Sequence, residues 1–203
     1  IIGACDWETQ VWLDGQPLGT HRGGYTPFEF ELTPRLRPGR ESRLTLRVDD
    51  RPRPFKLEGK QGYGNARGIW QTVYLEARPQ AFLKSVQFSP DIDRGRVAVR
   101  AKLSAAAAAN TAVKLRFKTG DLPEVSQAVA EGAEEVRFEV AIPNARLWSL
   151  EDPFLYEVEA ALQAGDQADR VGTYFGMRKI SVVNLPGTNH PYIALNNRPI
   201  YLR

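Results

Sequence analysis

The chain has 203 residues, enough for one large or two modest domains that each bury a core of their own. Hydrophobic residues make up 42% and charged residues 25% of the sequence, which argues against intrinsic disorder. The 27 Lys and Arg residues stand against 24 Asp and Glu residues and are scattered, and no apolar run approaches the roughly 20 residues that span a bilayer, so neither nucleic-acid binding nor a membrane-spanning segment is expected.

The first 76 residues carry the alternating pattern of short strands. Residues 11–15, VWLDG, run into an Asp-Gly pair that favours a tight hairpin turn, because both positions tolerate positive φ. Residues 28–32 and 44–48 alternate apolar and polar side chains in the same way. Residues 67–76, RGIWQTVYLE, are rich in β-branched and aromatic residues and predict a strand that closes this first unit.

A second set of strands is predicted after Pro79. The runs that alternate apolar and polar residues are 97–103, 113–117, 136–142 and 156–162. The alanine-rich run 105–109 is too short to meet the cost of helix nucleation and is expected to be a loop. The pattern therefore predicts an all-β protein built of antiparallel sandwiches.

The residues that could hold a metal or a cofactor are few. Cys5 is the single cysteine, so no intrachain disulfide can form, and His21 and His190 are the only histidines. We therefore expect no metal site and no cofactor. The cellular compartment, cytoplasmic or secreted and periplasmic, stays open.

Several segments, in the right order along the chain, resemble glycoside hydrolase family 2, the group of β-galactosidases, β-mannosidases and β-glucuronidases. These segments are residues 6–33 (DWETQVWLDGQPLGTHRGGYTPFEFELT), 67–76 (RGIWQTVYLE), 145–162 (ARLWSLEDPFLYEVEAAL), 174–182 (YFGMRKISV) and 195–203 (LNNRPIYLR). The resemblance implies a partial jelly-roll sandwich followed by an immunoglobulin-like β-sandwich. It assigns residues 1–79 to the later part of a sugar-binding jelly roll, 80–181 to the immunoglobulin-like domain, and 182–203 to a linker and the start of a (β/α)8 catalytic barrel. A longer parent protein is expected.

The resemblance also implies a function for that parent, the hydrolysis of β-linked glycosides by a retaining mechanism. Both catalytic glutamates are then expected beyond Arg203, so this chain is predicted to hold no catalytic residue and to be inactive alone. β-Galactosidase is the first choice of activity, because the form RGIWQTVYLE is commonest among bacterial proteins of that name. The expected partners are a carbohydrate substrate, bound through the full-length enzyme, and the chain's own catalytic barrel, while homo-oligomer formation stays open.

One loop is predicted to contact a sugar. The stretch before RGIWQTVYLE is similar in position to one that reaches toward the barrel mouth in the family, where one type of galactosidase has an acidic residue. Here Lys60 and Gln61 take that place, which speaks against a galactosidase-type ion site. Lys60, Gln61, Asn65 and Arg67 offer donors to sugar hydroxyls, and Tyr63 offers a ring for stacking. The alternative is a solvated loop in which Arg67 pairs locally.

Two other functions are considered. A non-catalytic carbohydrate-binding or structural β-sandwich protein would need an exposed aromatic platform to bind sugars, yet the four tryptophans, Trp7, Trp12, Trp70 and Trp148, lie in strand-like or edge motifs and are predicted to be buried. The second of these functions, an adhesion or receptor module of immunoglobulin type, is disfavoured because it does not account for the segment LNNRPIYLR at residues 195–203.

Overall fold

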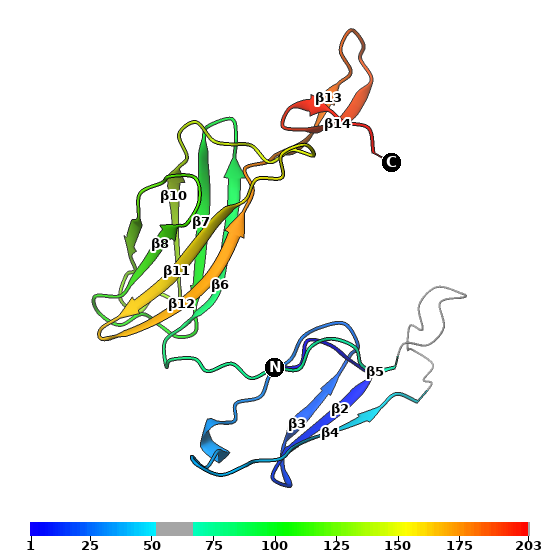
Figure 1. Ribbon diagram of the computed structural model, residues 1–203, viewed down its shortest axis with the longest axis vertical. Coiled ribbons are helices and arrows are strands. Elements are labelled where there is room, and N and C mark those ends of the chain that lie inside the picture. The colour runs from blue at the N-terminus through cyan, green and yellow to red at the C-terminus, as the bar shows by residue number, and fades with distance from the viewer. Residues whose placement is uncertain (52–66, 203) are drawn as a thin grey trace. The chain divides into compact units, whose positions relative to one another are not determined.

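The computed structural model describes residues 1–51 and 67–202 (Figure 1). The chain divides into two compact units, Ile1–Ala77 and Arg78–Arg203. The described residues form β-strands and one short 3-10 turn, η1 (Thr33–Arg35), without an α-helix. The predicted all-β class is therefore confirmed. Within these described ranges, no helix is long and apolar enough to cross a bilayer.

The described residues of the first unit, 1–51 and 67–77, form five short strands. They are β1 (Cys5–Asp6), β2 (Glu8–Leu13), β3 (Gln16–Arg22), β4 (Leu44–Asp49) and β5 (Gly68–Ile69). Strands β3, β2 and β4 form one antiparallel sheet in that order, and β1 pairs with β5 in a second. The predicted hairpin turn joins β2 to β3, with positive φ at Asp14 and Gly15. A small core is formed by the buried side chains of Ile2, of Cys5 on β1 and of Val11 on β2.

Two predicted strands of this unit are shorter than the sequence pattern suggests. Phe28 makes only an isolated bridge to Ile2, and of residues 67–76 only the two residues of β5 lie in a strand. The ladder stops after β5 because the amide groups of Trp70 and Gln71 both donate to the carbonyl of Ala4. Two residues thus face one acceptor, which interrupts regular pairing as a bulge does.

The second unit is a β-sandwich with an added small sheet. Its strands are β6 (Leu83–Asp91), β7 (Arg96–Leu103), β8 (Ala112–Phe117), β9 (Val125–Ala128), β10 (Glu135–Ala141), β11 (Tyr156–Ala164), β12 (Gln167–Phe175), β13 (Ile180–Asn184), β14 (Pro191–Leu195) and β15 (Arg198–Pro199). The sheet β10-β7-β6 packs face to face on the sheet β12-β11-β8-β9 (Figure 1). The four strands predicted after Pro79 are confirmed as β7, β8, β10 and β11.

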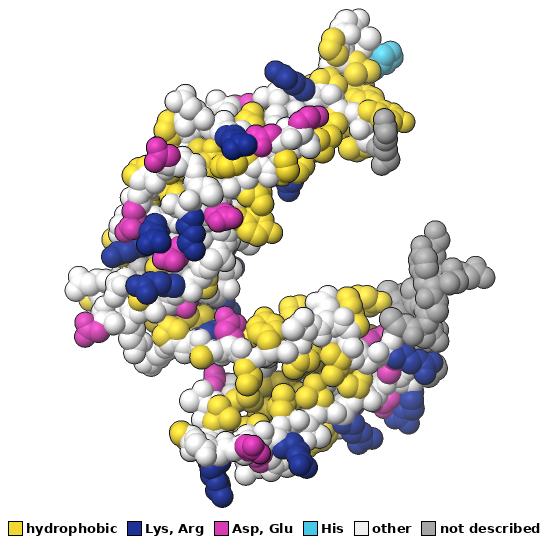
Figure 2. Space-filling model, viewed as in Figure 1, with side chains coloured by type: hydrophobic (Ala, Val, Ile, Leu, Met, Phe, Trp, Pro, Cys, Tyr) yellow, Lys and Arg dark blue, Asp and Glu magenta, His cyan; other side chains and the backbone are white. Residues whose placement is uncertain are grey.

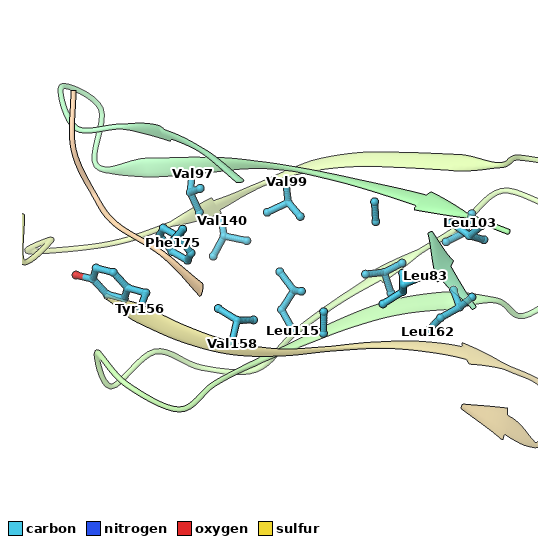
Figure 3. Close-up of a cluster of buried hydrophobic side chains, with 14 of the residues drawn as sticks. Leu83, Val97, Val99, Leu103, Leu115, Val140, Tyr156, Val158, Leu162 and Phe175 are labelled. Atoms are coloured by element: carbon cyan, nitrogen blue, oxygen red, sulfur yellow. The ribbon is translucent and has the colours of Figure 1, made fainter. Parts of the chain in front are cut away.

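The core of the sandwich forms because alternate residues of facing strands point inward. Figure 3 shows Val97 and Val99 pointing from β7 toward Leu115 on β8 and Val158 on β11. All four side chains are at most 1% exposed. The opposite faces of the same strands carry charged residues, so the period of two in the sequence directly encodes which face is buried.

The third sheet, β13-β14-β15, is tied to the sandwich through a two-residue turn. Asn196 and Asn197 at this turn both have positive φ, which asparagine tolerates better than most residues. The Asn196 side-chain amide donates to the carbonyl of Trp148 at 2.9 Å, and its oxygen accepts from the Lys179 amide at 3.0 Å. Asn197 donates to Asp93 at the β6–β7 turn. The assignment of residues 182–203 to the start of a barrel stays a prediction.

Candidate functional site

Most of the predicted sugar-contacting residues lie outside the residues that the structure describes. These are Lys60, Gln61, Tyr63 and Asn65. Arg67 is described, is exposed, and immediately precedes β5. Among the predicted sugar-contacting residues, Arg67 is therefore the one whose surroundings the structure describes.

A buried carboxyl group lies across the sheet from this position. Asp6 on β1 pairs with Gly68 on β5, and only 8% of Asp6 is exposed. A Cβ atom added to Gly24 would lie 3.0 Å from the Asp6 carboxyl carbon, so Gly24 allows the close approach of its loop to this carboxyl group. Burial raises the pKa of the neighbouring Cys5 thiol, and the charge of Asp6 adds to that rise. Cys5 is thus held as a neutral thiol and is a poor nucleophile.

The loop that covers Asp6 is anchored to two tryptophans. The Gly23 amide, at a residue with φ of +128°, donates to the Trp7 carbonyl at 3.0 Å. The Trp70 indole Nε1–H donates to the Gly24 carbonyl at 2.7 Å. These bonds place the Tyr25 ring against the Trp70 ring, with centroids 5.8 Å apart and planes inclined at 64°.

The two rings of this pair are open to solvent. Tyr25 is 66% exposed and Trp70 45% exposed. The prediction that all four tryptophans are buried is therefore wrong, since Trp70 is exposed and Trp7, Trp12 and Trp148 are half-buried. Trp70 comes directly after β5 (Gly68–Ile69), so regular strand geometry does not fix which face its side chain takes. Its indole donates to the carbonyl of Gly24.

The solvent-facing part of this arrangement is the ring pair of Tyr25 and Trp70, because only 8% of Asp6 is exposed. Exposed aromatic rings can pack on the C–H face of a sugar. From the sequence, Arg67 is predicted as a site residue, whereas Asp6, Tyr25 and Trp70 are not. Asp6 starts a strand-like run and carries no sign of burial in the sequence, and Gly23-Gly24 before Tyr25 is typical of any turn.

The second unit has a surface hollow of about 540 Å³ between β6 and β12. Its lining includes Phe88, Trp148, Leu155, Tyr174 and Arg178. The Arg178 guanidinium lies over the Trp148 ring, 5.0 Å from the centroid. The lining contains no carboxyl group, so the hollow lacks the acid that glycoside chemistry requires.

The carboxyl groups with a clear pKa shift are all held in the charged form. Hydrogen bonds from Arg100 and Arg137 lower the pKa of Glu135 to about 2. Hydrogen bonds likewise lower the pKa of Asp14 (from the Arg43 amide), Asp93 (from Lys179) and Asp152 (from Arg146). A general acid in glycoside hydrolysis needs a raised pKa, so none of these four fits that role. No group of three or more His, Cys, Asp or Glu residues within 1–51 and 67–202 is placed to hold a metal ion.

Comparison with known proteins identifies the relatives of this chain. The sequence model of the family described as glycosyl hydrolases family 2 matches residues 81–178. A β-galactosidase of Klebsiella pneumoniae is 28% identical over 220 residues, covering 100% of this chain and 20% of that protein. A putative β-glucuronidase of Formosa agariphila is 25% identical, covering 97% of this chain and 24% of that protein. The chain thus spans only about a fifth of the length of these relatives.

Solved structures share the fold. The crystal structure of Bacteroides uniformis β-glucuronidase superposes with a TM-score of 0.76 at 22% identity, covering 100% of this chain and 26% of that chain. The Ruminococcus gnavus β-glucuronidase gives a TM-score of 0.73 at 20% identity, covering 100% of this chain and 35% of that chain. The fold of this chain is therefore shared with part of each of these two β-glucuronidases. Together with the sequence match over residues 81–178, this supports a relationship of the chain to glycosyl hydrolases family 2.

Proposed function

We propose that this chain is the accessory β-sandwich portion of a glycosidase that hydrolyses β-linked glycosides with retention of configuration. The match of residues 81–178 to the family model carries the proposal, and the galactosidase and glucuronidase relatives support it. The proposed partners of the chain are the carbohydrate substrate and the catalytic domain of the same enzyme.

We assign the bond-breaking chemistry to parts of the enzyme other than this chain. A retaining glycosidase needs two carboxyl groups about 5 to 5.5 Å apart, one as acid and base and the other as nucleophile. The described carboxylates with resolved shifts are held ionised by cations or amide groups, which supports a structural role for them. The hydrolytic step then belongs to the four-fifths of the relatives' length that this chain does not match.

A β-galactoside is the proposed substrate class. Several β-galactosidases are among the relatives, for example the large subunit of the Latilactobacillus sakei enzyme, which is 29% identical over 85% of this chain. The glucuronidases among the solved structures are under 25% identical and inform the fold only.

The test is an assay of the full-length protein on nitrophenyl β-galactoside, β-glucuronide and β-mannoside. We expect turnover of at least one β-glycoside, with the galactoside giving the highest kcat/KM. A higher value for the glucuronide would overturn the substrate class, and the absence of turnover on all three would overturn the glycosidase proposal.

A second candidate function, non-catalytic carbohydrate binding, gains support from the exposed rings of Tyr25 and Trp70. The same assay separates the two candidates, because a pure binding protein would not turn over any of the glycosides. The predicted contact from Lys60 and its neighbours stays a prediction.

A further inference from the structure

We propose that the hollow between β6 and β12 of the second unit binds an aromatic carboxylate, a small molecule with a flat apolar ring system and one negative charge. The hollow measures about 540 Å³. This volume lies in the range of roughly 300 to 1,000 Å³ that is usual for small-molecule sites. All of its lining residues belong to the second unit. The proposal goes beyond the glycosidase function and does not depend on it.

The hollow lies where the edges of the two sandwich sheets meet. β6 is an edge strand of the sheet β10-β7-β6, and β12 is an edge strand of the sheet β12-β11-β8-β9. Alternate residues of β6 that line the hollow, Val86, Phe88 and Pro90, are only half-buried. Phe88 stacks on Phe175 of β12, with ring centroids 4.8 Å apart. The edge of the core therefore presents an apolar, aromatic surface to the hollow.

Trp148 is held beside the hollow through its backbone. Its amide donates to the Met177 carbonyl at 3.0 Å, and its carbonyl accepts from the Asn196 side-chain amide at 2.9 Å. A Cβ atom added to Gly176 would lie 3.3 Å from the Trp148 Cβ, so glycine allows the close approach of the two segments. Because these contacts exist before a ligand arrives, less conformational entropy is lost on binding.

Arg178 is the only charged residue in the lining of the hollow. Its guanidinium lies over the Trp148 ring, 5.0 Å from the centroid. Arg146 also lies over a ring, that of Phe154 at 4.3 Å, but it donates two hydrogen bonds of 2.7 Å to Asp152. Among residues 1–51 and 67–202, by contrast, no ion pair involves Arg178.

The positive charge in the hollow is thus left for an anion. Elsewhere on the visible face of the second unit, Lys and Arg side chains lie among Asp and Glu side chains, and pairs such as Arg96 with Glu139 neutralise each other (Figure 2). A guanidinium that stacks on a ring keeps its N–H donors in its own plane. Arg178 can therefore donate two parallel hydrogen bonds to a carboxylate while it stays on Trp148.

The remaining lining residues decide between an aromatic ligand and a saccharide. Besides Arg178, the polar side chains of the lining are the hydroxyl groups of Thr173 and Tyr174, and the lining contains no Asp, Glu, Asn or Gln. A buried saccharide would leave most of its hydroxyl groups without a side-chain partner, which costs free energy. A flat aromatic ring instead packs on the rings of Phe88, Trp148 and Tyr174. The lining therefore favours an aromatic body with one anionic group.

The experiment is an NMR titration of the 203-residue chain with 2-naphthoate, following its four indole N–H signals. We expect a saturable shift of the Trp148 signal, with a dissociation constant on the order of 1 mM, and no saturable shift of the Trp70 signal. Two further probes separate charge from shape. 2-Naphthamide keeps the rings without the charge, octanoate keeps the charge without the rings, and each should bind at least about fivefold more weakly.

Two arginines of the second unit provide the variant and its matched control. Arg178→Gln should weaken 2-naphthoate binding at least about fivefold. Arg170 is exposed on β12 and lies outside the lining, so Arg170→Gln removes the same charge and should leave the affinity unchanged. Arg178→Lys keeps the charge and should retain more affinity than Arg178→Gln. The amide spectrum of each variant shows directly whether the second unit is intact.

Each outcome decides the proposal. No saturable shift of Trp148, or equal losses from Arg178→Gln and Arg170→Gln, would overturn the site. Equal affinity for 2-naphthoate and either of the other probes would overturn the ligand class. Binding of 2-naphthoate to the chain but not to the full-length protein would also overturn the site, because another part of the enzyme would then fill the hollow. Hydrolysis of glycosides by the full-length protein bears on neither result, so this proposal and the glycosidase proposal fail separately.

Discussion

From the core between the two sheets of the second unit, we predict how much one buried leucine contributes to the free energy of unfolding. Leu115 is 0% exposed and lies between the sheets, opposite Val99 of β7 (Figure 3). Replacing it by alanine removes three carbon atoms and leaves a cavity where the two sheets hold the walls apart. Fully buried Leu→Ala changes cost about 2 to 5 kcal/mol, and we expect about 3 kcal/mol here.

Leu150 provides the control for this change. It belongs to the same unit but is 63% exposed, so Leu150→Ala should cost less than about 0.5 kcal/mol. Amide hydrogen exchange of β7 and β11 measures the stability of this unit separately from the first. A loss of 3 kcal/mol corresponds to roughly 100-fold faster exchange of amides that open with the whole unit. A difference between the two variants below about 1 kcal/mol would refute the assignment of Leu115 to a rigid core.

Two further predictions concern polar contacts of the second unit. Because Arg100 and Arg137 lower the pKa of Glu135 from 4.5 to about 2, the carboxylate stabilises the fold above pH 4.5, and this contribution is lost as the pH falls toward 2. Glu135→Gln should therefore flatten the pH dependence of urea stability between pH 4.5 and 2, and an unchanged slope there would contradict the ion pairs. Asn196→Gly keeps the left-handed turn but removes the side-chain bonds to Trp148 and Lys179, so it should cost about 2 kcal/mol and speed exchange of the Lys179 amide. Exchange of that amide at the wild-type rate would show that the turn does not tie the third sheet to the sandwich.

The sequence predicted the sandwich better than the first unit, for a physical reason. In the second unit, strands such as β7 and β11 bury one face over eight or nine residues, so the alternation is long and unbroken. In the first unit, the segment 67–76 has the same alternation, but its partner, residues 1–6, pairs regularly only at Cys5 and Asp6. Strand propensity alone could not show that the Ala4 carbonyl takes two donors and ends the ladder.

The candidate site shows the same limit. Arg67 was found by its place beside a recognisable segment, whereas Asp6, Tyr25 and Trp70 come together only through contacts between residues far apart in the chain. The Trp70 indole donates to the carbonyl of Gly24, 46 residues away. Such a bond leaves no local pattern, so a tryptophan in a strand-like run is predicted to be buried.

We propose that this chain is part of a glycosidase but does not itself break the glycosidic bond. The most direct measurement compares the pure 203-residue chain with the full-length protein on nitrophenyl β-galactoside under the same conditions. We expect turnover by the full-length protein and none by the 203-residue chain. Turnover by the chain alone, at a rate that follows its concentration through purification, would contradict it.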